Sequence, residues 1–157
     1  MKVIHTLNPI YDSNSKILIL GSMPSVKSRQ LNFYYANPQN RFWPVLERLF
    51  NTSINDKINF LLNNYIALWD VIKSCDIDGS NDASIKNVEV NDVNYILKNS
   101  NITKIFVTGK KAYELYNKYL FKETNIEAIC LPSPSSANAK YSLDDLVKEY
   151  IVIKQFL

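Results

Sequence analysis

Four short apolar runs, almost free of polar alternation, constrain the fold of this chain more than any other feature. They span residues 16–21, 65–68, 104–107 and 126–131. A strand with one face in water alternates apolar and polar residues, whereas an unalternating run is typical of a strand covered on both faces. The runs therefore predict a sheet buried between two layers.

Amphipathic helices are predicted between and after these runs. Apolar residues recur at helical spacing over 42–50, 112–119 and 146–153. The last helix is expected to open at Ser142, whose hydroxyl can cap it, with Asp145 three residues on. Strands that alternate with helices imply right-handed crossovers. We predict an α/β fold, a three-layer α/β/α sandwich with a central, mostly parallel sheet of about four strands, in a single domain over 1–157.

Length and composition limit the classes of protein that remain. At 157 residues and 46% hydrophobic, the chain can bury one sizeable core but not two ordinary domains. No segment approaches about 18 consecutive apolar residues, and the N-terminus lacks the pattern of a signal peptide. We expect a cytoplasmic protein without a membrane contact. The net charge of +3 fits a nucleic-acid partner without requiring one.

Several common chemistries are excluded by residue counts. Glycine occurs only three times and never in a GxGxxG or GxxxxGK[ST] pattern, which excludes the usual dinucleotide and P-loop motifs. With two cysteines, Cys75 and Cys130, and one histidine, the usual zinc or iron–sulfur ligand sets cannot be assembled. We expect no metal and no cofactor, and reduced thiols.

A serine nucleophile is also disfavoured. Ser22 follows Gly21 at the end of the first run, but a serine triad needs a histidine base. The only histidine, His5, lies in an N-terminal segment with no motif around it. We interpret His5 as a surface or packing residue.

Two loops leave the ends of predicted strands, where parallel sheets bind ligands. The first starts at Gly21 and leads through an aromatic cluster to the polar turn 37–40; the second is Leu-Pro-Ser-Pro-Ser-Ser-Ala-Asn at 131–138. An aromatic face beside hydrogen-bonding amides suits a flipped nucleobase, which needs one group to stack on it and others to read its edge. Tyr34 and Tyr35 could instead be ordinary core aromatics. Asn40 could merely cap the following helix, a role compatible with a site.

The second loop is either a rigid turn or a DNA contact. Its hydroxyls and free amides can bind phosphates, and its prolines limit the entropy lost on binding. The residues expected to contact DNA are Ser133, Pro134, Ser135, Ser136 and Asn138. Cations near the two loops are expected to bind phosphates; they are Lys27, Arg29, Arg41 and Lys140.

Taken together, the two loops resemble the uracil-DNA glycosylase superfamily, and most closely its hypoxanthine (deoxyinosine) DNA glycosylase branch. The similarity runs from about Ile17 to about Ala139 and includes 67–71 and 79–82. The resemblance implies base excision repair: a monomeric hydrolase that binds double-stranded DNA and flips a deaminated base out of the helix. It then cleaves the N-glycosidic bond. Hypoxanthine is the expected base, with uracil in mismatches second.

The resemblance also implies roles for individual residues. Asn40 matches the catalytic asparagine of the deoxyinosine branch. Most of the superfamily has aspartate or asparagine two positions after the glycine, where this chain has Met23, and fast uracil-specific enzymes have histidine where it has Leu131. Both departures argue against a fast uracil-specific enzyme.

The implied base-binding residues are Gly21, Ser22, Met23, Pro24, Tyr35 and Asp70. Asp70 could accept the N1–H of hypoxanthine or serve only the structure of its loop. Two other functions stay open. One is a catalytically inactive nucleic-acid or nucleotide-binding module of the same fold, favoured by Met23 and Leu131. The other is a flavodoxin-like sandwich that binds a small anion, for which no residue speaks specifically.

Overall fold

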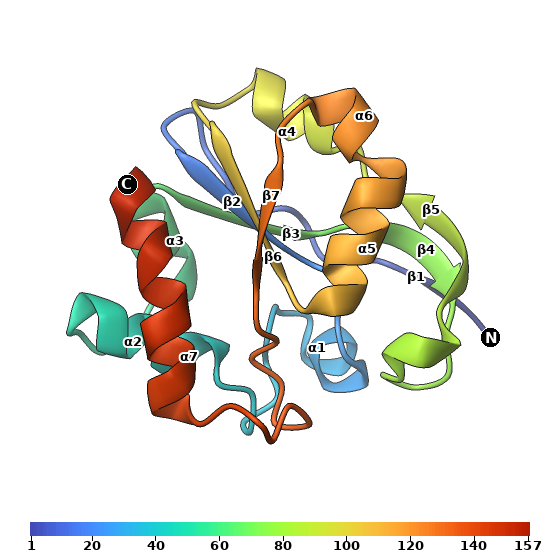
Figure 1. Ribbon diagram of the computed structural model, residues 1–157, viewed down its shortest axis with the longest axis horizontal. Helices are drawn as coiled ribbons and strands as arrows, with labels where there is room; N and C mark the ends of the chain where they lie inside the picture. The colour runs from blue at the N-terminus through green and yellow to red at the C-terminus, as the bar shows by residue number, and fades with distance from the viewer.

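A four-stranded parallel sheet forms the centre of the computed structural model, which describes all residues 1–157 (Figure 1). Its order is β3-β2-β6-β7, and every neighbouring pair is parallel. The strands are β2 (Ile17–Gly21), β3 (Ile66–Asp70), β6 (Lys104–Thr108) and β7 (Ala128–Leu131). Each strand overlaps one of the four apolar runs, so the prediction of a parallel sheet of about four strands is confirmed.

Helices cover both faces of this sheet. All five residues of β2 are buried, and they enter two cores in alternation: Ile17 and Ile19 on one side, Leu18 and Leu20 on the other. The first core is closed by α2 (Phe42–Phe50), α3 (Lys57–Asn63), α7 (Leu143–Tyr150) and the 3₁₀ turn η2 (Ile151–Phe156). The second is closed by α4 (Val93–Lys98) and α5 (Lys110–Tyr119). Because neither face of β2 is exposed to water, its sequence does not alternate between apolar and polar residues. The prediction of a three-layer sandwich is confirmed.

The C-terminal helix begins as predicted. The Ser142 hydroxyl accepts from the Asp145 backbone N–H at 3.1 Å, and the Asp145 carboxylate accepts from the Ser142 N–H at 3.0 Å. This capping box satisfies two amide donors that helix geometry leaves unpaired. The α-helix ends at Tyr150, and Ile153 lies in the following 3₁₀ turn. No helix of the structure combines the length and apolar character needed to span a membrane.

A second, antiparallel sheet was not predicted. It has the order β1-β4-β5, with β1 (Lys2–Ile4), β4 (Ile72–Asp76) and β5 (Lys86–Val90). The register between β4 and β5 shifts twice, and β5 is mostly exposed. Three short elements complete the fold: α1 (Val26–Leu31), the 3₁₀ turn η1 (Asp82–Ser84) and α6 (Phe121–Thr124).

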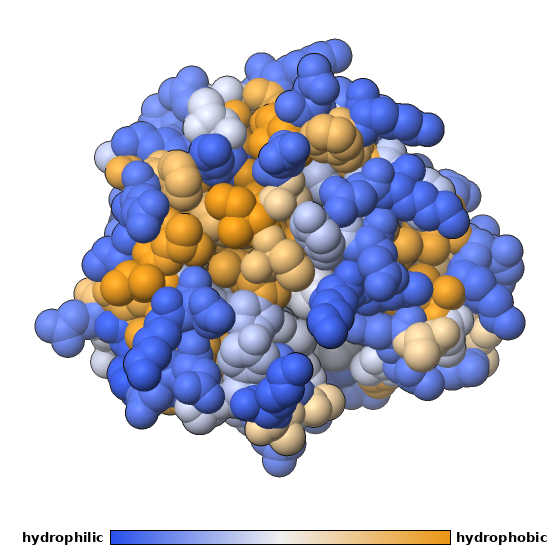
Figure 2. All heavy atoms as spheres, viewed as in Figure 1, coloured by the Kyte–Doolittle hydropathy of each residue, from blue (hydrophilic) through white to orange (hydrophobic).

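The edge strand β7 lies open between α5 and α7 in the view of Figure 1. Hydrophobic residues gather in that region of the surface, while hydrophilic residues dominate around it (Figure 2). Ala128 and Ile129 of β7 are only partly buried, and Cys130 is exposed. The loop after β7 descends toward the carboxyl edge of the sheet, where the loop after β2 also lies.

A buried asparagine joins the two sheets. β4 starts two residues after β3 ends, and the Asn91 amide bridges this junction by donating to the carbonyls of Asp70 at 2.9 Å and Ile72 at 3.1 Å. The Asn91 side chain thereby satisfies carbonyls that neither sheet pairs.

We predict that Asn91→Ala lowers the free energy of unfolding by about 2–3 kcal/mol, because two neutral hydrogen bonds are lost and buried carbonyls stay unpaired. Asn94→Ala is the matched control: it removes one exposed hydrogen bond to the Glu123 carbonyl and should cost under about 0.5 kcal/mol. Urea unfolding of both variants measures the difference, and equal losses would contradict this role of Asn91.

Candidate active site

A cleft of about 140 Å³ opens at the carboxyl edge of the parallel sheet, between the loops that follow β2 and β7. It is smaller than the roughly 300–1,000 Å³ of pockets for drug-sized ligands, which suits a single planar ring. The predicted residues that line it are Gly21, Ser22, Met23, Pro24, Tyr35, Asn40, Asp70, Ser133, Pro134 and Ser135. Ser136 and Asn138, also predicted, do not line it.

Asn40 lies at the amino end of α2 and lines the cleft. Its Oδ1 accepts a hydrogen bond from the Phe42 N–H at 2.8 Å, and its own N–H donates to the Asn37 carbonyl at 2.9 Å. The Nδ2 group forms no hydrogen bond within the protein. This contact is an Asx turn and not the expected helix cap, because Arg41 is the N-cap residue of α2 and no side chain caps that helix. The turn fixes the Asn40 side chain at the cleft and leaves its amide N–H groups for a ligand or water.

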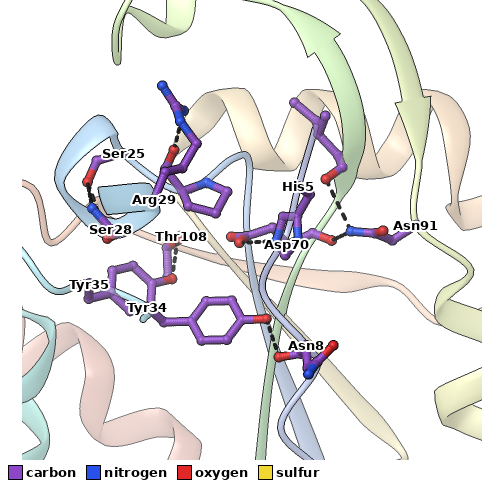
Figure 3. Close-up of polar contacts among 12 residues, drawn as sticks. His5, Asn8, Ser25, Ser28, Arg29, Tyr34, Tyr35, Asp70, Asn91 and Thr108 are labelled. Carbon is purple, nitrogen blue, oxygen red and sulfur yellow. Dashed lines mark hydrogen bonds and ion pairs between the residues drawn. The ribbon is translucent and has the colours of Figure 1, made fainter. Parts of the chain in front are cut away.

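Tyr35 forms one wall of the cleft. Its ring stacks on that of Phe42, with centroids 4.0 Å apart and planes 17° from parallel, and its hydroxyl lies 3.2 Å from Thr108 Oγ1 (Figure 3). Burial, with a smaller contribution from the nearby Asp70 charge, raises the pKa of the phenol well above its usual value. Tyr35 therefore keeps its proton and can donate a hydrogen bond.

Its neighbour Tyr34 has a structural role. The Tyr34 hydroxyl donates to the Asn8 carbonyl at 2.7 Å, and the Tyr34 carbonyl accepts from Trp43 Nε1 at 3.0 Å. The ring is 3% exposed within the first core. Both tyrosines line the cleft, but Tyr34 is at the same time a core aromatic, whereas Tyr35 is only partly buried.

Of the two roles that the sequence left open for His5, surface or packing, the structure shows the packing role, because the side chain is buried. Its Nε2 lies 2.8 Å from Asp70 Oδ2, and the two side chains are 2% and 5% exposed (Figure 3). The partners are 65 positions apart in the chain, and His5 reaches Asp70 because β1 pairs with β4. No local motif marks this contact, so only the unpredicted second sheet reveals it.

Gly21 is required by the close approach of Asp70. A Cβ atom at position 21 would lie 2.5 Å from Asp70 Oδ1 and 3.3 Å from the Tyr35 hydroxyl oxygen. Polar atoms of Asp70, Tyr35 and Thr108 therefore converge above the Gly21 backbone. Asp70 Oδ1 accepts no hydrogen bond from the protein, which leaves an acceptor facing this convergence.

The loop after β2 offers donors. The backbone N–H groups of Ser22 and Met23 form no hydrogen bond within the protein, and the Ser22 hydroxyl donates to Asp82 Oδ1 over 3.4 Å. Asp82, which also lines the cleft, was not predicted as a site residue. Arg29 braces the loop by donating to the carbonyls of Pro24 at 2.7 Å and Gly79 at 3.2 Å. Its guanidinium therefore stabilises the loop, and a phosphate contact by the same group stays a prediction.

Arg41 stabilises the second loop in the same way, by donating hydrogen bonds to its carbonyls. Its guanidinium donates to the carbonyls of Ser135 at 2.8 Å and Asn138 at 3.0 Å, to that of Tyr141, and over 3.4 Å to that of Pro134. Its backbone N–H also donates to the Pro134 carbonyl at 3.0 Å. Four of the guanidinium's hydrogen bonds thus go to this loop, and a phosphate contact by Arg41 stays a prediction.

The hydroxyl groups of Ser133 and Ser135 in the second loop accept hydrogen bonds but donate none within the protein. Ser133 Oγ accepts from the Ser135 N–H and Ser135 Oγ from the Ala137 N–H, both at 3.2 Å. Asn138 turns inward, with its amide donating to the Ser133 carbonyl at 3.0 Å, and Ser136 is exposed. Ser133 and Ser135 can therefore each still donate one hydrogen bond at the cleft.

A larger cavity of about 300 Å³ lies elsewhere, between residues 6–11, 32–34 and α3. Its lining includes Phe33, Ile58 and Leu62 but no carboxylate, histidine, lysine or arginine. The convergence of polar groups thus marks the smaller cleft as the candidate active site. No group of three or more His, Cys, Asp and Glu side chains in the structure could hold a metal ion.

We predict that Arg41→Lys loosens the second loop, because an ammonium cannot reproduce the planar fork that binds several carbonyls at once. Amide hydrogen exchange over 134–141 should quicken by about tenfold, while exchange in β2 and β6 stays slow. Arg48→Lys is the control, since Arg48 lies on the same helix and pairs with Asp144 on the surface. Equal exchange in both variants would refute the role of Arg41.

Comparisons with known proteins agree with this site. The family model described as the uracil DNA glycosylase superfamily matches residues 9–152. A hypoxanthine DNA glycosylase of Methanosarcina acetivorans is 35% identical over 85% of this chain and 87% of its own length. Another, of Methanosarcina barkeri, is 36% identical over 84% and 86%.

A solved structure is similar as well. The solution NMR structure of a Methanosarcina acetivorans protein with the provisional name uracil DNA glycosylase superimposes with a TM-score of 0.83. It is 32% identical, and the match covers 99% of each chain. Fold, family model and relatives agree over nearly the same residues, and the chain belongs to the uracil DNA glycosylase superfamily.

Proposed function

We propose that this protein is a DNA glycosylase that flips a deaminated base, hypoxanthine first, out of double-stranded DNA and hydrolyses its N-glycosidic bond. It acts as a cytoplasmic monomer without a cofactor. One observation carries the proposal: Asn40, Tyr35 and Asp70 line a single cleft at the carboxyl edge of the sheet. The two relatives that bear the name hypoxanthine DNA glycosylase support the choice of base.

The polar groups of the cleft complement the edge of hypoxanthine. That edge presents the N1–H donor beside the O6 acceptor, and the cleft offers the Asp70 Oδ1 acceptor together with the unpaired N–H groups of Ser22 and Met23. Adenine presents an N1 acceptor and an N6 donor, the reverse pattern, and would face Asp70 lone pair to lone pair. Uracil shares the donor–acceptor edge of hypoxanthine, so uracil in a mismatch is the second substrate.

Catalysis then depends on Asn40. The Asn40 amide positions the attacking water, and its fixed orientation at the start of α2 removes the entropic cost of alignment. Negative charge that develops on the leaving base is stabilised by N–H donors of the first loop. Met23 supplies no water ligand, and Leu131 is 2% exposed in the core and supplies no group for the base.

DNA is held by the second loop. Ser133 and Ser135 donate their free hydroxyl protons to phosphates, and Ser136 reaches them from the exposed loop. The long-range attraction comes from four cations near the two loops: Lys27, Arg29, Arg41 and Lys140. The two lysines are exposed and unpaired, and the two guanidinium groups keep their charge because they donate to neutral carbonyls. Pro134, which is buried, and Asn138 maintain the shape of the loop.

The alternative is a binding module of the same fold without catalysis, and Met23 favours it. Incubation with duplexes that carry inosine, uracil or xanthine, followed by alkaline cleavage at abasic sites, separates the two functions. Strand cleavage at inosine establishes the glycosylase. Tight binding without cleavage at any base would establish the module.

We predict that Asn40→Ala reduces single-turnover excision of hypoxanthine by about 10²-fold or more while DNA affinity is kept, because the positioned water is lost. Folding should survive, since one neutral hydrogen bond contributes about 1 kcal/mol. Asn40→Ser is the matched control for the turn, because a serine hydroxyl can accept from the Phe42 N–H without offering an amide. It should recover stability and not activity. Recovery of both would reduce Asn40 to a turn residue.

We predict that Tyr35→Ala weakens discrimination for inosine more than overall DNA affinity, because stacking on one base contributes about 1–3 kcal/mol while phosphate contacts persist. Tyr35→Phe keeps the ring and loses only the contact with Thr108, so it should retain most of the discrimination. Fluorescence anisotropy with inosine and adenosine duplexes compares the variants. If a folded Tyr35→Ala discriminates as the parent does, the ring does not touch the base.

A further inference from the structure

The buried pair of His5 and Asp70 has no other ionic partner. Only two ion pairs occur in the structure, and the second, between Arg48 and Asp144, lies on the surface. The His5 ring is flanked by the rings of Tyr34 and Trp69, with centroids 6.2 and 6.5 Å away. One imidazole N–H is thus the only side-chain hydrogen-bond donor that contacts the Asp70 carboxylate.

Both members of the pair are held by the backbone. The His5 N–H donates to the Lys73 carbonyl at 2.7 Å, which docks His5 on β4, and Asn91 binds the Asp70 carbonyl. With Oδ2 bound to the imidazole, the other oxygen of Asp70 is directed to the place above Gly21 where Tyr35 and Thr108 converge. The orientation of Oδ1 therefore depends on a residue outside the cleft.

The chemistry of base reading needs this oxygen to keep its lone pair. A buried carboxylate without a hydrogen-bond partner is costly, and rotation toward water relieves that cost. A rotated Asp70 would no longer present Oδ1 where the N1–H of hypoxanthine needs an acceptor. It would also no longer repel the N1 lone pair of adenine. Loss of the partner would thus both weaken and misdirect recognition.

We propose that His5 is the positioning residue for base recognition: its ring N–H holds the Asp70 carboxylate so that Oδ1 receives the N1–H of hypoxanthine and rejects adenine. This inference rests on the proposed function and assigns specificity to a residue that touches no substrate. It also explains why the only histidine of the chain is buried at the active site although no triad uses it.

Two substitutions at His5 test the proposal. His5→Leu removes the donor, whereas the amide of His5→Gln can still donate to Asp70 Oδ2. Because a hydrogen bond to a charged group is lost, His5→Leu should slow single-turnover hypoxanthine excision by about 10- to 100-fold. His5→Gln should stay within about threefold of the parent. Thermal midpoints of both variants are measured alongside, so that a loss of activity through unfolding is recognised.

A double-variant cycle separates positioning from packing. In the Asp70→Asn background the carboxylate is gone, so adding His5→Leu should change excision by less than about threefold, far below its effect in the parent. If the two losses multiply instead, His5 acts independently of Asp70 and the proposal fails. It also fails if His5→Leu excises at the parental rate, or if His5→Gln falls as far as His5→Leu.

Binding of DNA distinguishes this proposal from the proposed activity. The ratio of dissociation constants for adenosine and inosine duplexes should be large for the parent and His5→Gln, and should approach one for His5→Leu. If the parent shows this preference but forms no abasic sites, the glycosylase function fails while the role of His5 stands. A parent without the preference overturns the role of His5, whereas the glycosylase function is decided by strand cleavage alone.

Discussion

The hydrogen bonds of one guanidinium bring the two halves of the cleft together. Arg41, at the start of α2, donates to the Ser135, Asn138 and Tyr141 carbonyls, 94 to 100 positions further along the chain. These hydrogen bonds hold the loop after β7 against the amino end of α2. Asn40 directly precedes Arg41, so of two adjacent residues Arg41 holds the loop in place and Asn40 lines the cleft. A guanidinium is suited to this position because its fork satisfies several buried carbonyls that a lysine would leave unpaired.

The opposite wall depends on the second sheet. β4 continues almost directly from β3, so Asp70, at the end of β3, sits where the two sheets meet. Asn91 fixes its backbone and His5 its carboxylate, and both reach it through residues of the antiparallel sheet. The parallel sheet provides the place where loops converge, as in other open α/β sheets. The small sheet provides the rigidity that lets a carboxylate approach Gly21 so closely that no Cβ would fit.

The sequence predicted those helices and strands that are determined by interactions between residues close together in the chain. The four core strands followed from apolar runs because β2 is buried on both faces, and α7 followed from its capping box. The second sheet escaped prediction because β1 has three residues and β5 is largely exposed, which leaves no periodic signal. The contact of His5 with Asp70 was missed for the same reason, because it depends on this sheet. The contacts of Arg29 and Arg41 with loop carbonyls were also missed, because a sequence gives the charge of a guanidinium but not the carbonyls within its reach.

The structure shows what the side chains do at the two positions, Met23 and Leu131, where this chain departs from the superfamily pattern. Met23 packs partly against the core on the α5 side, and Leu131 is buried in the core on the other side, so both positions contribute apolar contacts where the family resemblance implies polar groups in most of the superfamily or in fast uracil-specific enzymes. In the proposed function, the polar chemistry comes from Asn40 before α2 and from a carboxylate held by His5. An acceptor beside unpaired N–H donors selects every base with an N–H next to a carbonyl, hypoxanthine and uracil alike. Such bases are then distinguished by the free energy needed to extrude each one from the duplex, which is lowest where its base pair is weakest.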